Sequence, residues 1–277
     1  MDFRTQVDIS EPPFLIEPCE EILFVGSCFA DAVGQRFRDE AFPATVNPYG
    51  VMYNPASILH TIEKLKVEGI KRKENAPNTA FLTLGTNHVY RLKETGEIVD
   101  NCEKRPAALF QEEELSVDQC ADYLQQSVDL LRTLNPDVHI VFTVSPIRYR
   151  KYGYHESQLS KATLLLAIDK LLHLTSDIRH LQYFPAYEIL LDELRDYRFY
   201  AADMLHPSDQ AVDFIWERLV DSYFSPAAKA YLAEWRPLKL ALAHKPFNPD
   251  SSEYQAFHEQ TLLKIEEFRK KYPHLAI

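Results

Sequence analysis

Residues 21–30 read Glu-Ile-Leu-Phe-Val-Gly-Ser-Cys-Phe-Ala. The first six of these form a short apolar run that ends in glycine, which predicts a buried β-strand. The segment that follows predicts a helix over 29–41, because it places apolar side chains on one helix face, namely Phe29, Ala30, Val33, Phe37 and Ala41. Ser27 is therefore expected at a strand-to-helix junction, with its hydroxyl exposed and backbone N–H groups facing a bound anion. Taken alone, Ser27 is better explained as a helix cap.

The chain beyond this junction alternates predicted strands and helices. Strands are expected over 44–50, 79–85, 139–144 and 182–189, with a hairpin formed by 89–92 and 97–102. Helices are expected over 54–68, 116–134, 156–174 and from near residue 208 to 223. Such alternation predicts an α/β sandwich with a mainly parallel sheet.

The last fifty residues have a different pattern. Aromatic and aliphatic side chains recur there at helical spacing, namely Tyr254, Phe257, Thr261, Ile265, Phe268 and Tyr272. We therefore expect an α/β domain over residues 1–224 and a C-terminal helical extension over 225–277 that packs on it, the two forming one structural unit.

The composition limits the classes of partner. The chain has 277 residues, 46% hydrophobic and 26% charged, as in an ordinary globular protein. Its formal net charge of −11 disfavours nucleic acid and acidic membrane surfaces as partners. No apolar run is long enough for a membrane helix, the N-terminus lacks the apolar stretch of a signal peptide, and the four cysteines lack metal-site spacing. We therefore expect a cytoplasmic protein, and neither a cofactor nor a metal, since the ten histidines form no zinc motif.

The sequence Asp203-Met-Leu-His206 indicates a second role for Ser27, that of a catalytic nucleophile. It follows the last predicted strand, and a carboxylate three residues before a histidine can accept from its Nδ1–H. That bond fixes the imidazole tautomer and leaves Nε2 free to take a proton from a serine. In an open parallel sheet the carboxyl ends of the strands share one edge, so these residues are candidates for a catalytic triad.

An acyl-transfer site also needs hydrogen-bond donors for the oxyanion. The candidates are the N–H of Ser27, the N–H of Gly50 and the side-chain amide of Asn87, which follow the first three predicted strands. The alternative for Gly50 is an ordinary turn. Arg148 is a candidate for substrate binding, with a structural salt bridge as its alternative. Cys28 is expected to face the core and not to act as a nucleophile.

Gly26-Ser27-Cys28-Phe29-Ala30 resembles the signature of the GSCFA family. The resemblance continues through most of the chain, in the motifs at 47–55, 83–86, 101–102, 145–148, 196–200 and 203–207. It implies a three-layer flavodoxin-like sandwich with the serine site of SGNH hydrolases. On the family's Asn-Cys motif, Asn101 is a further candidate for substrate binding and a rival to Asn87 as oxyanion donor. Asn47 and Asn54 are the other rivals.

These observations together predict a serine hydrolase. In this hypothesis Ser27 attacks an ester, His206 is the general base and Asp203 orients it. The expected substrate is a small-molecule or carbohydrate ester, by analogy with related folds. The alternatives are an O-acyltransferase that uses the same triad and a non-catalytic binding module.

Overall fold

The computed structural model describes residues 4–69, 76–174 and 179–276. Its central sheet has five strands in the order β2-β1-β3-β7-β8, and every pairing in it is parallel. The strands are β1 (Ile22–Gly26), β2 (Ala44–Val46), β3 (Thr79–Leu84), β7 (His139–Val144) and β8 (Leu181–Tyr183). Numbered among themselves they run 2-1-3-4-5, which is the flavodoxin-like order. The predicted parallel α/β fold is confirmed.

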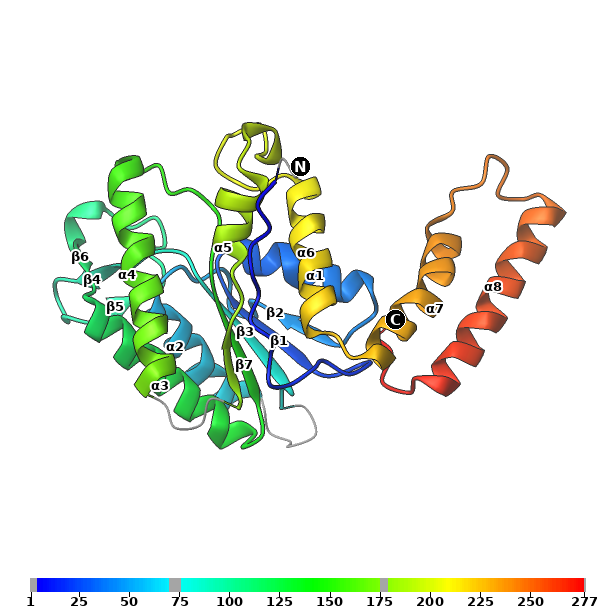
Figure 1. Ribbon diagram of the computed structural model, residues 1–277, viewed down its shortest axis with the longest axis horizontal. Coiled ribbons are helices and arrows are strands. Elements are labelled where there is room, and N and C mark those ends of the chain that lie inside the picture. The colour runs from blue at the N-terminus through cyan, green and yellow to red at the C-terminus, as the bar shows by residue number, and fades with distance from the viewer. Residues whose placement is uncertain (1–3, 70–75, 175–178, 277) are drawn as a thin grey trace.

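Helices cover both faces of this sheet (Figure 1). One face carries α1 (Cys28–Asp39), the short α5 (Ala186–Glu188) and α6 (Asp209–Tyr223). The other carries α2 (Pro55–Lys64), α3 (Val117–Leu134) and α4 (Gly153–Leu174). Strand β1 supplies both cores: Phe24 packs with the first set of helices and Val25 with the second. The fold is thus a three-layer sandwich.

Short helical segments and a second sheet complete the α/β part. Two π-helical segments span Leu65–Gly69 and Ile189–Leu194, and two 3-10 segments span Ala107–Leu109 and Tyr197–Phe199. The second sheet is antiparallel, in the order β5-β4-β6, with β4 (His88–Leu92), β5 (Ile98–Val99) and β6 (Phe110–Glu114). The predicted hairpin is confirmed as β4–β5. Strand β6 was not predicted because Phe-Gln-Glu-Glu-Glu is largely exposed and lacks apolar alternation.

The predicted strand over 182–189 is wrong beyond its first residues. Strand β8 ends at Tyr183, and the chain turns at Pro185 into α5 and then into a π-helical segment. A short apolar run does not separate a strand from a buried helix, because both bury every side chain. The proline, which donates no backbone hydrogen bond, marks the change.

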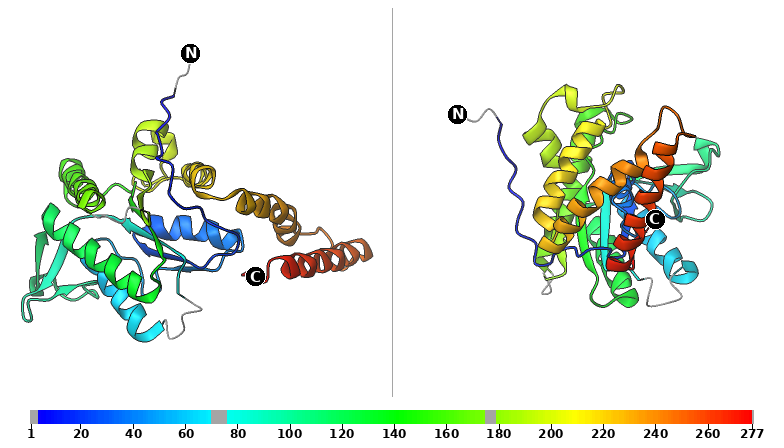
Figure 2. Two further views of the ribbon diagram at one scale, coloured as in Figure 1. Left: turned by 60° about the horizontal axis from the view of Figure 1, so that its bottom comes forward. Right: turned by 90° about the vertical axis from the view of Figure 1, so that its right-hand side faces the viewer.

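Two long helices form the C-terminal extension, α7 (Pro226–Ala243) and α8 (Ser252–Lys271). They project to one side of the sandwich, away from the second sheet (Figures 1 and 2). Trp235 of α7 stacks on Phe268 of α8, and the Tyr231 hydroxyl donates to the Glu40 carbonyl at 2.7 Å. Helix α7 was not predicted, because the prolines in this region were interpreted as breaks in the secondary structure. Pro226 is nevertheless compatible with the helix, because it lies in the first turn, where a backbone N–H has no acceptor within the helix. The proposed division at residues 224/225 falls between α6 and α7.

No helix in the described part of the chain is both long enough and apolar enough to cross a bilayer.

Candidate active site

The junction between β1 and α1 is built around a glycine. Gly26 has φ +153°, and a Cβ on it would lie 2.2 Å from the Thr83 carbonyl oxygen of the neighbouring strand. A side chain there would therefore separate β1 from β3. The next residue, Ser27, donates its N–H to the same Thr83 carbonyl at 3.1 Å. Its Oγ accepts from the Phe29 N–H at 3.3 Å, so Ser27 is also the N-cap of α1.

Asn47 stabilises this junction from the side. Its Oδ1 accepts from the Gly26 N–H at 2.8 Å, and its Nδ2 donates to Asp31 of α1 at 2.7 Å. Asn47 is buried and itself has φ +41°. One amide therefore links the end of β1 to the first turn of α1, which gives the Asn47 side chain a structural role.

The segment 52–54 links β1 to the end of β3, and the Met52 N–H donates to the Gly26 carbonyl at 2.8 Å. The Tyr53 carbonyl accepts from the N–H groups of both Gly85 and Thr86, at 2.7 and 2.8 Å. Asn54 is the N-cap of α2, because its Oδ1 accepts from the Ser57 N–H at 2.9 Å. The carboxyl ends of β1 and β3, where the order of the strands reverses, are thus held together by backbone bonds.

Asp203 and His206 lie in the loop before α6 and form a charge-assisted pair. Asp203 Oδ2 lies 2.5 Å from His206 Nδ1, and Oδ1 accepts the N–H groups of Leu205 and His206 at 2.8 and 3.0 Å. These two backbone bonds, together with the imidazole, lower the pKa of Asp203 to about 2. The carboxylate is therefore ionised at neutral pH and holds the imidazole by Nδ1, which leaves Nε2 free.

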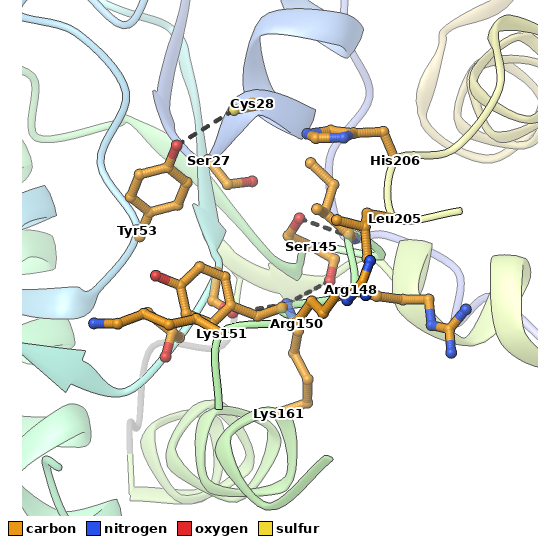
Figure 3. Close-up of a pocket in the computed structure, with 14 residues that line it drawn as sticks. Ser27, Cys28, Tyr53, Ser145, Arg148, Arg150, Lys151, Lys161, Leu205 and His206 are labelled. Carbon is orange, nitrogen blue, oxygen red and sulfur yellow. Dashed lines mark hydrogen bonds between the residues drawn. The ribbon is translucent and has the colours of Figure 1, made fainter. Parts of the chain in front are cut away.

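Ser27 and His206 line the same pocket, at the carboxyl end of the sheet (Figure 3). The pocket has a volume of about 270 Å³ and takes its walls from the residues after β1, β3 and β7 and from the 205–206 loop. Ser27 is only 1% exposed, whereas the His206 side chain is 46% exposed. Among the described contacts no hydrogen bond joins Ser27 to His206, and in unliganded sites such bonds are often long.

The predicted oxyanion donors have other partners in this structure. The Ser27 N–H donates to the Thr83 carbonyl, as described above. The Gly50 N–H donates to the Asn47 carbonyl at 2.9 Å, and the Asn87 amide donates to the Leu115 carbonyl at 2.8 Å. Gly50 and Asn87 are not among the residues that line the pocket.

The two predicted substrate-binding residues lie in different places. Asn101 is exposed, outside the pocket lining, and accepts the Glu103 N–H. Arg148 lines the pocket, but its guanidinium stacks on Tyr154 at 4.2 Å and donates to the Met204 carbonyl at 3.2 Å. It therefore also anchors the loop that carries His206.

Cys28 does not face the core, so that expectation is wrong. It is half-buried, lines the pocket beside Ser27, and its Sγ lies 3.5 Å from the Tyr53 hydroxyl. The next two residues of α1, Phe29 and Ala30, face the core, whereas Cys28 lies on the side of the first turn that lines the pocket.

Lys161 of α4 was not singled out from the sequence. It is 2% exposed, lines the pocket, and donates to the carbonyls of Gly85 and Ser145 at 2.7 and 2.8 Å. Burial lowers the pKa of its ammonium from 10.5 to about 7. The sequence did contain a signal for its burial, because Lys161 lies on the same helix face as Leu164, Ile168 and Leu171.

A metal has no evident site here. No group of three or more metal-ligating side chains gathers within the described ranges.

Comparison with solved structures finds distant likenesses. A Streptococcus pneumoniae protein, provisionally described as a platelet activating factor, is 17% identical with a TM-score of 0.49 over 76% of this chain and 85% of its own. A member of the lipolytic protein G-D-S-L family from Veillonella parvula is 13% identical, with a TM-score of 0.46 over 73% and 97%. A family 3 carbohydrate esterase from Clostridium thermocellum is 12% identical, with a TM-score of 0.42 over 81% and 99%. At this distance none of them assigns an activity to this chain.

No curated protein matches the sequence. Family models do: the GSCFA family model matches residues 21–76 and 66–219, and the model of the GSCFA domain protein, C-terminal domain, matches residues 235–277. The first model includes the Gly26–Ser27 junction, the segments that hold it and the Asp203–His206 pair. Since it matches well over half of the chain, the protein belongs to the GSCFA family.

Proposed function

We propose that the protein is a serine hydrolase of small esters, of the SGNH type. The observation that carries the proposal is that Ser27 and the Asp203–His206 pair meet at one pocket, where the sheet presents the ends of its strands. A non-catalytic binding module has no need of an imidazole that is oriented by a carboxylate beside a serine.

The geometry supports a two-step reaction. Ser27 Oγ attacks the ester carbonyl while His206 Nε2 takes its proton, and the imidazolium then gives that proton to the departing alcohol. Water attacks the acyl-enzyme with His206 again as base, which releases the acid and restores Ser27. Asp203 stabilises the imidazolium in both steps without exchanging a proton.

A free backbone donor for the oxyanion lies next to the nucleophile. The Cys28 N–H is the first of α1, and no acceptor for it lies among the described residues. The partial positive charge at the helix N-terminus adds to its effect. Gly50 and Asn87 would first have to leave their present partners, so we propose the Cys28 N–H as the main donor.

The size of the pocket favours a small substrate. Its volume of about 270 Å³ is near the lower end of the range for ligand sites, roughly 300–1,000 Å³. We therefore propose short acyl groups, with O-acetylated sugars among the candidate substrates.

We also retain a cytoplasmic location as a proposal. All four cysteines are free, as expected in a reducing compartment. Fractionation of cells that produce the native protein tests it.

An ester screen tests the activity. Purified protein is assayed on chromogenic acetate and butyrate esters and on acetylated sugars, in parallel with Ser27→Ala and Ser145→Ala. Ser145 is a matched control, because it is a buried serine in the same pocket that follows β7. We expect Ser145→Ala to keep most activity and Ser27→Ala to lose it. Equal rates for Ser27→Ala and wild type would refute the proposal.

A further inference from the structure

The charged side chains that line the pocket are all basic. Four basic side chains line it, and no carboxylate does so among the described residues: Arg148, Arg150, Lys151 and Lys161. The chain as a whole has the opposite bias, with 41 acidic and 30 basic residues. A cationic pocket in an acidic protein attracts anions toward one place on its surface.

Two of the four cations are already occupied. Lys151 pairs with Glu112 at 3.1 Å, on the second sheet. Arg148 stacks on Tyr154 and holds the Met204 carbonyl. Lys151 thus has a counter-ion, and Arg148, which pairs with no carboxylate among the described residues, is held by its ring and carbonyl contacts.

Lys161 is different because its charge is buried and has no counter-ion. Its ammonium has three donors, of which two bind the Gly85 and Ser145 carbonyls. No carboxylate lies within ion-pair distance of it in the described part of the chain. Figure 3 shows Lys161 reaching up from α4 to the floor of the pocket. Burial without a counter-ion disfavours the charged form of Lys161, and a bound anion would favour that form again.

Arg150 is the second cation without a partner. It is exposed, it lines the same pocket, and no acceptor for its guanidinium lies among the described residues. A guanidinium can bind a carboxylate or phosphate through two parallel hydrogen bonds. The pocket thus has one cation without a counter-ion at its floor, Lys161, and another at its rim, Arg150.

We propose that the pocket takes an ester whose acyl or alcohol part carries an anionic group, a carboxylate or a phosphate, held by Lys161 and Arg150 while Ser27 acts on the ester bond. This inference rests on the proposed hydrolase for its chemistry, but not for the binding of the anion.

A competing explanation is that Lys161 only ties the ends of β3 and β7 together. If Lys161 only links the strands, its substitution should change stability and the kcat/KM of all substrates alike. If Lys161 binds an anion, its substitution should change kcat/KM selectively for charged substrates. The ratio of kcat/KM for a charged ester to that for its neutral counterpart separates the two explanations.

The first experiment measures that ratio with 4-acetoxybenzoate and its methyl ester, which test an anion in the alcohol part. Mono-4-nitrophenyl succinate and its methyl ester test the acyl part, and 4-acetoxyphenyl phosphate tests a phosphate. We expect wild type to prefer at least one anionic ester by about tenfold or more, mainly through KM. Lys161→Met and Arg150→Gln should each reduce the preference several-fold.

Two variants serve as matched controls. Lys170→Met removes an exposed lysine from the same helix, which pairs with Asp118, and Arg236→Gln removes an exposed arginine of α7. Neither should change the preference. Should Lys161→Met fail to fold, Arg150→Gln at the exposed rim decides. A wild type that prefers the neutral esters, or a preference that survives both pocket substitutions, would overturn the inference.

The second experiment measures anion binding in the absence of catalysis. Ser27→Ala is titrated calorimetrically with 4-hydroxybenzoate, methyl 4-hydroxybenzoate, monomethyl succinate and inorganic phosphate. We expect an anion to bind and its neutral ester to bind at least about tenfold more weakly. Anion binding together with no ester hydrolysis by wild type would refute the hydrolase and leave the anion site standing. Hydrolysis without any preference for anions in either experiment would refute the anion site alone.

Discussion

The proposed nucleophile and its proposed base reach the pocket from two very different parts of the molecule. Ser27 is almost wholly buried, at the end of a central strand, and its neighbours are fixed by backbone bonds to β3. Asp203 and His206 are about half exposed, on a loop that is held by bonds within residues 201–206 and by Arg148. The sheet determines where the serine lies, whereas a few local hydrogen bonds determine where the base lies.

This difference indicates how each part should respond to substitution. Changes around Ser27 should affect folding and activity together, because the same atoms serve both. Changes in the 203–206 loop should affect activity and leave the fold intact. The experiments below test that separation.

Gly26→Ala should have the largest effect. The new methyl would collide with the Thr83 carbonyl, at a residue with φ +153°, and we expect a loss of about 3 kcal/mol or more in the free energy of unfolding. Gly50→Ala is the control, since φ is +95° there but the space around it is open, so we expect a loss of about 1–2 kcal/mol. Urea unfolding of both variants measures the difference. Equal losses would show that the close approach of β1 to β3 is unimportant.

His206→Ala should lower kcat by at least about 10²-fold, because it removes the imidazole that takes the Ser27 proton in the proposed mechanism. The melting temperature should change little, since the side chain is half exposed. His173→Ala, at an exposed histidine of α4, is the control. Retention of activity in His206→Ala would place the base elsewhere.

Asp203→Asn should have a smaller effect. An asparagine Oδ1 can still accept from the Leu205 and His206 N–H groups, so the loop keeps its shape while the charge-assisted bond to Nδ1 is lost. We expect kcat to fall on the order of tenfold or more with KM nearly unchanged. Steady-state kinetics of this variant and of Asp203→Ala separate the two roles, since the alanine also removes the backbone acceptor. If the two variants were equally active, the backbone bonds would have no part in holding the loop.

Lys161 should make the free energy of unfolding depend on pH. Its pKa is about 7 in the folded protein and near 10.5 in the unfolded chain, and burial is the cause. Between these values the unfolded chain binds the extra proton, so the free energy of unfolding should rise with pH from about 7 to about 10.5. Lys161→Met should lack this rise. Parallel slopes for wild type and variant over that range would show that Lys161 stays protonated when folded.

The sequence predicted strands β1, β3 and β7 from compact apolar runs, and α1 and α3 from apolar side chains at helical spacing. Residues 21–41 were placed correctly because the apolar run, the glycine and the helical spacing all agree with the tertiary structure. The segment after β8 was misjudged because a short, largely apolar run does not distinguish a strand from a buried helix, and Pro185 was not used as a sign of the change. Strand β6 was missed since its side chains face water on both sides.

The sequence predicted that Ser27 and His206 lie close to one pocket, but not which residues hold them there. Ser27, Asp203 and His206 were found from the order of motifs along the chain. The partners of Asn47 and Asn87 depend on contacts across 16 to 28 residues, so the sequence left their roles open. Cys28, at the start of α1, and Lys161, in the middle of α4, show the same limit, because the surroundings of each side chain depend on its tertiary neighbours.

Covalent labelling of the nucleophile tests the central claim most directly. Native protein is treated with a fluorophosphonate probe, digested, and the modified residue located by mass spectrometry, with Ser145→Ala and Ser27→Ala in parallel. We expect a single adduct on Ser27 in wild type and Ser145→Ala, and none in Ser27→Ala. An adduct on another residue, or labelling of Ser27→Ala equal to that of wild type, would contradict the account.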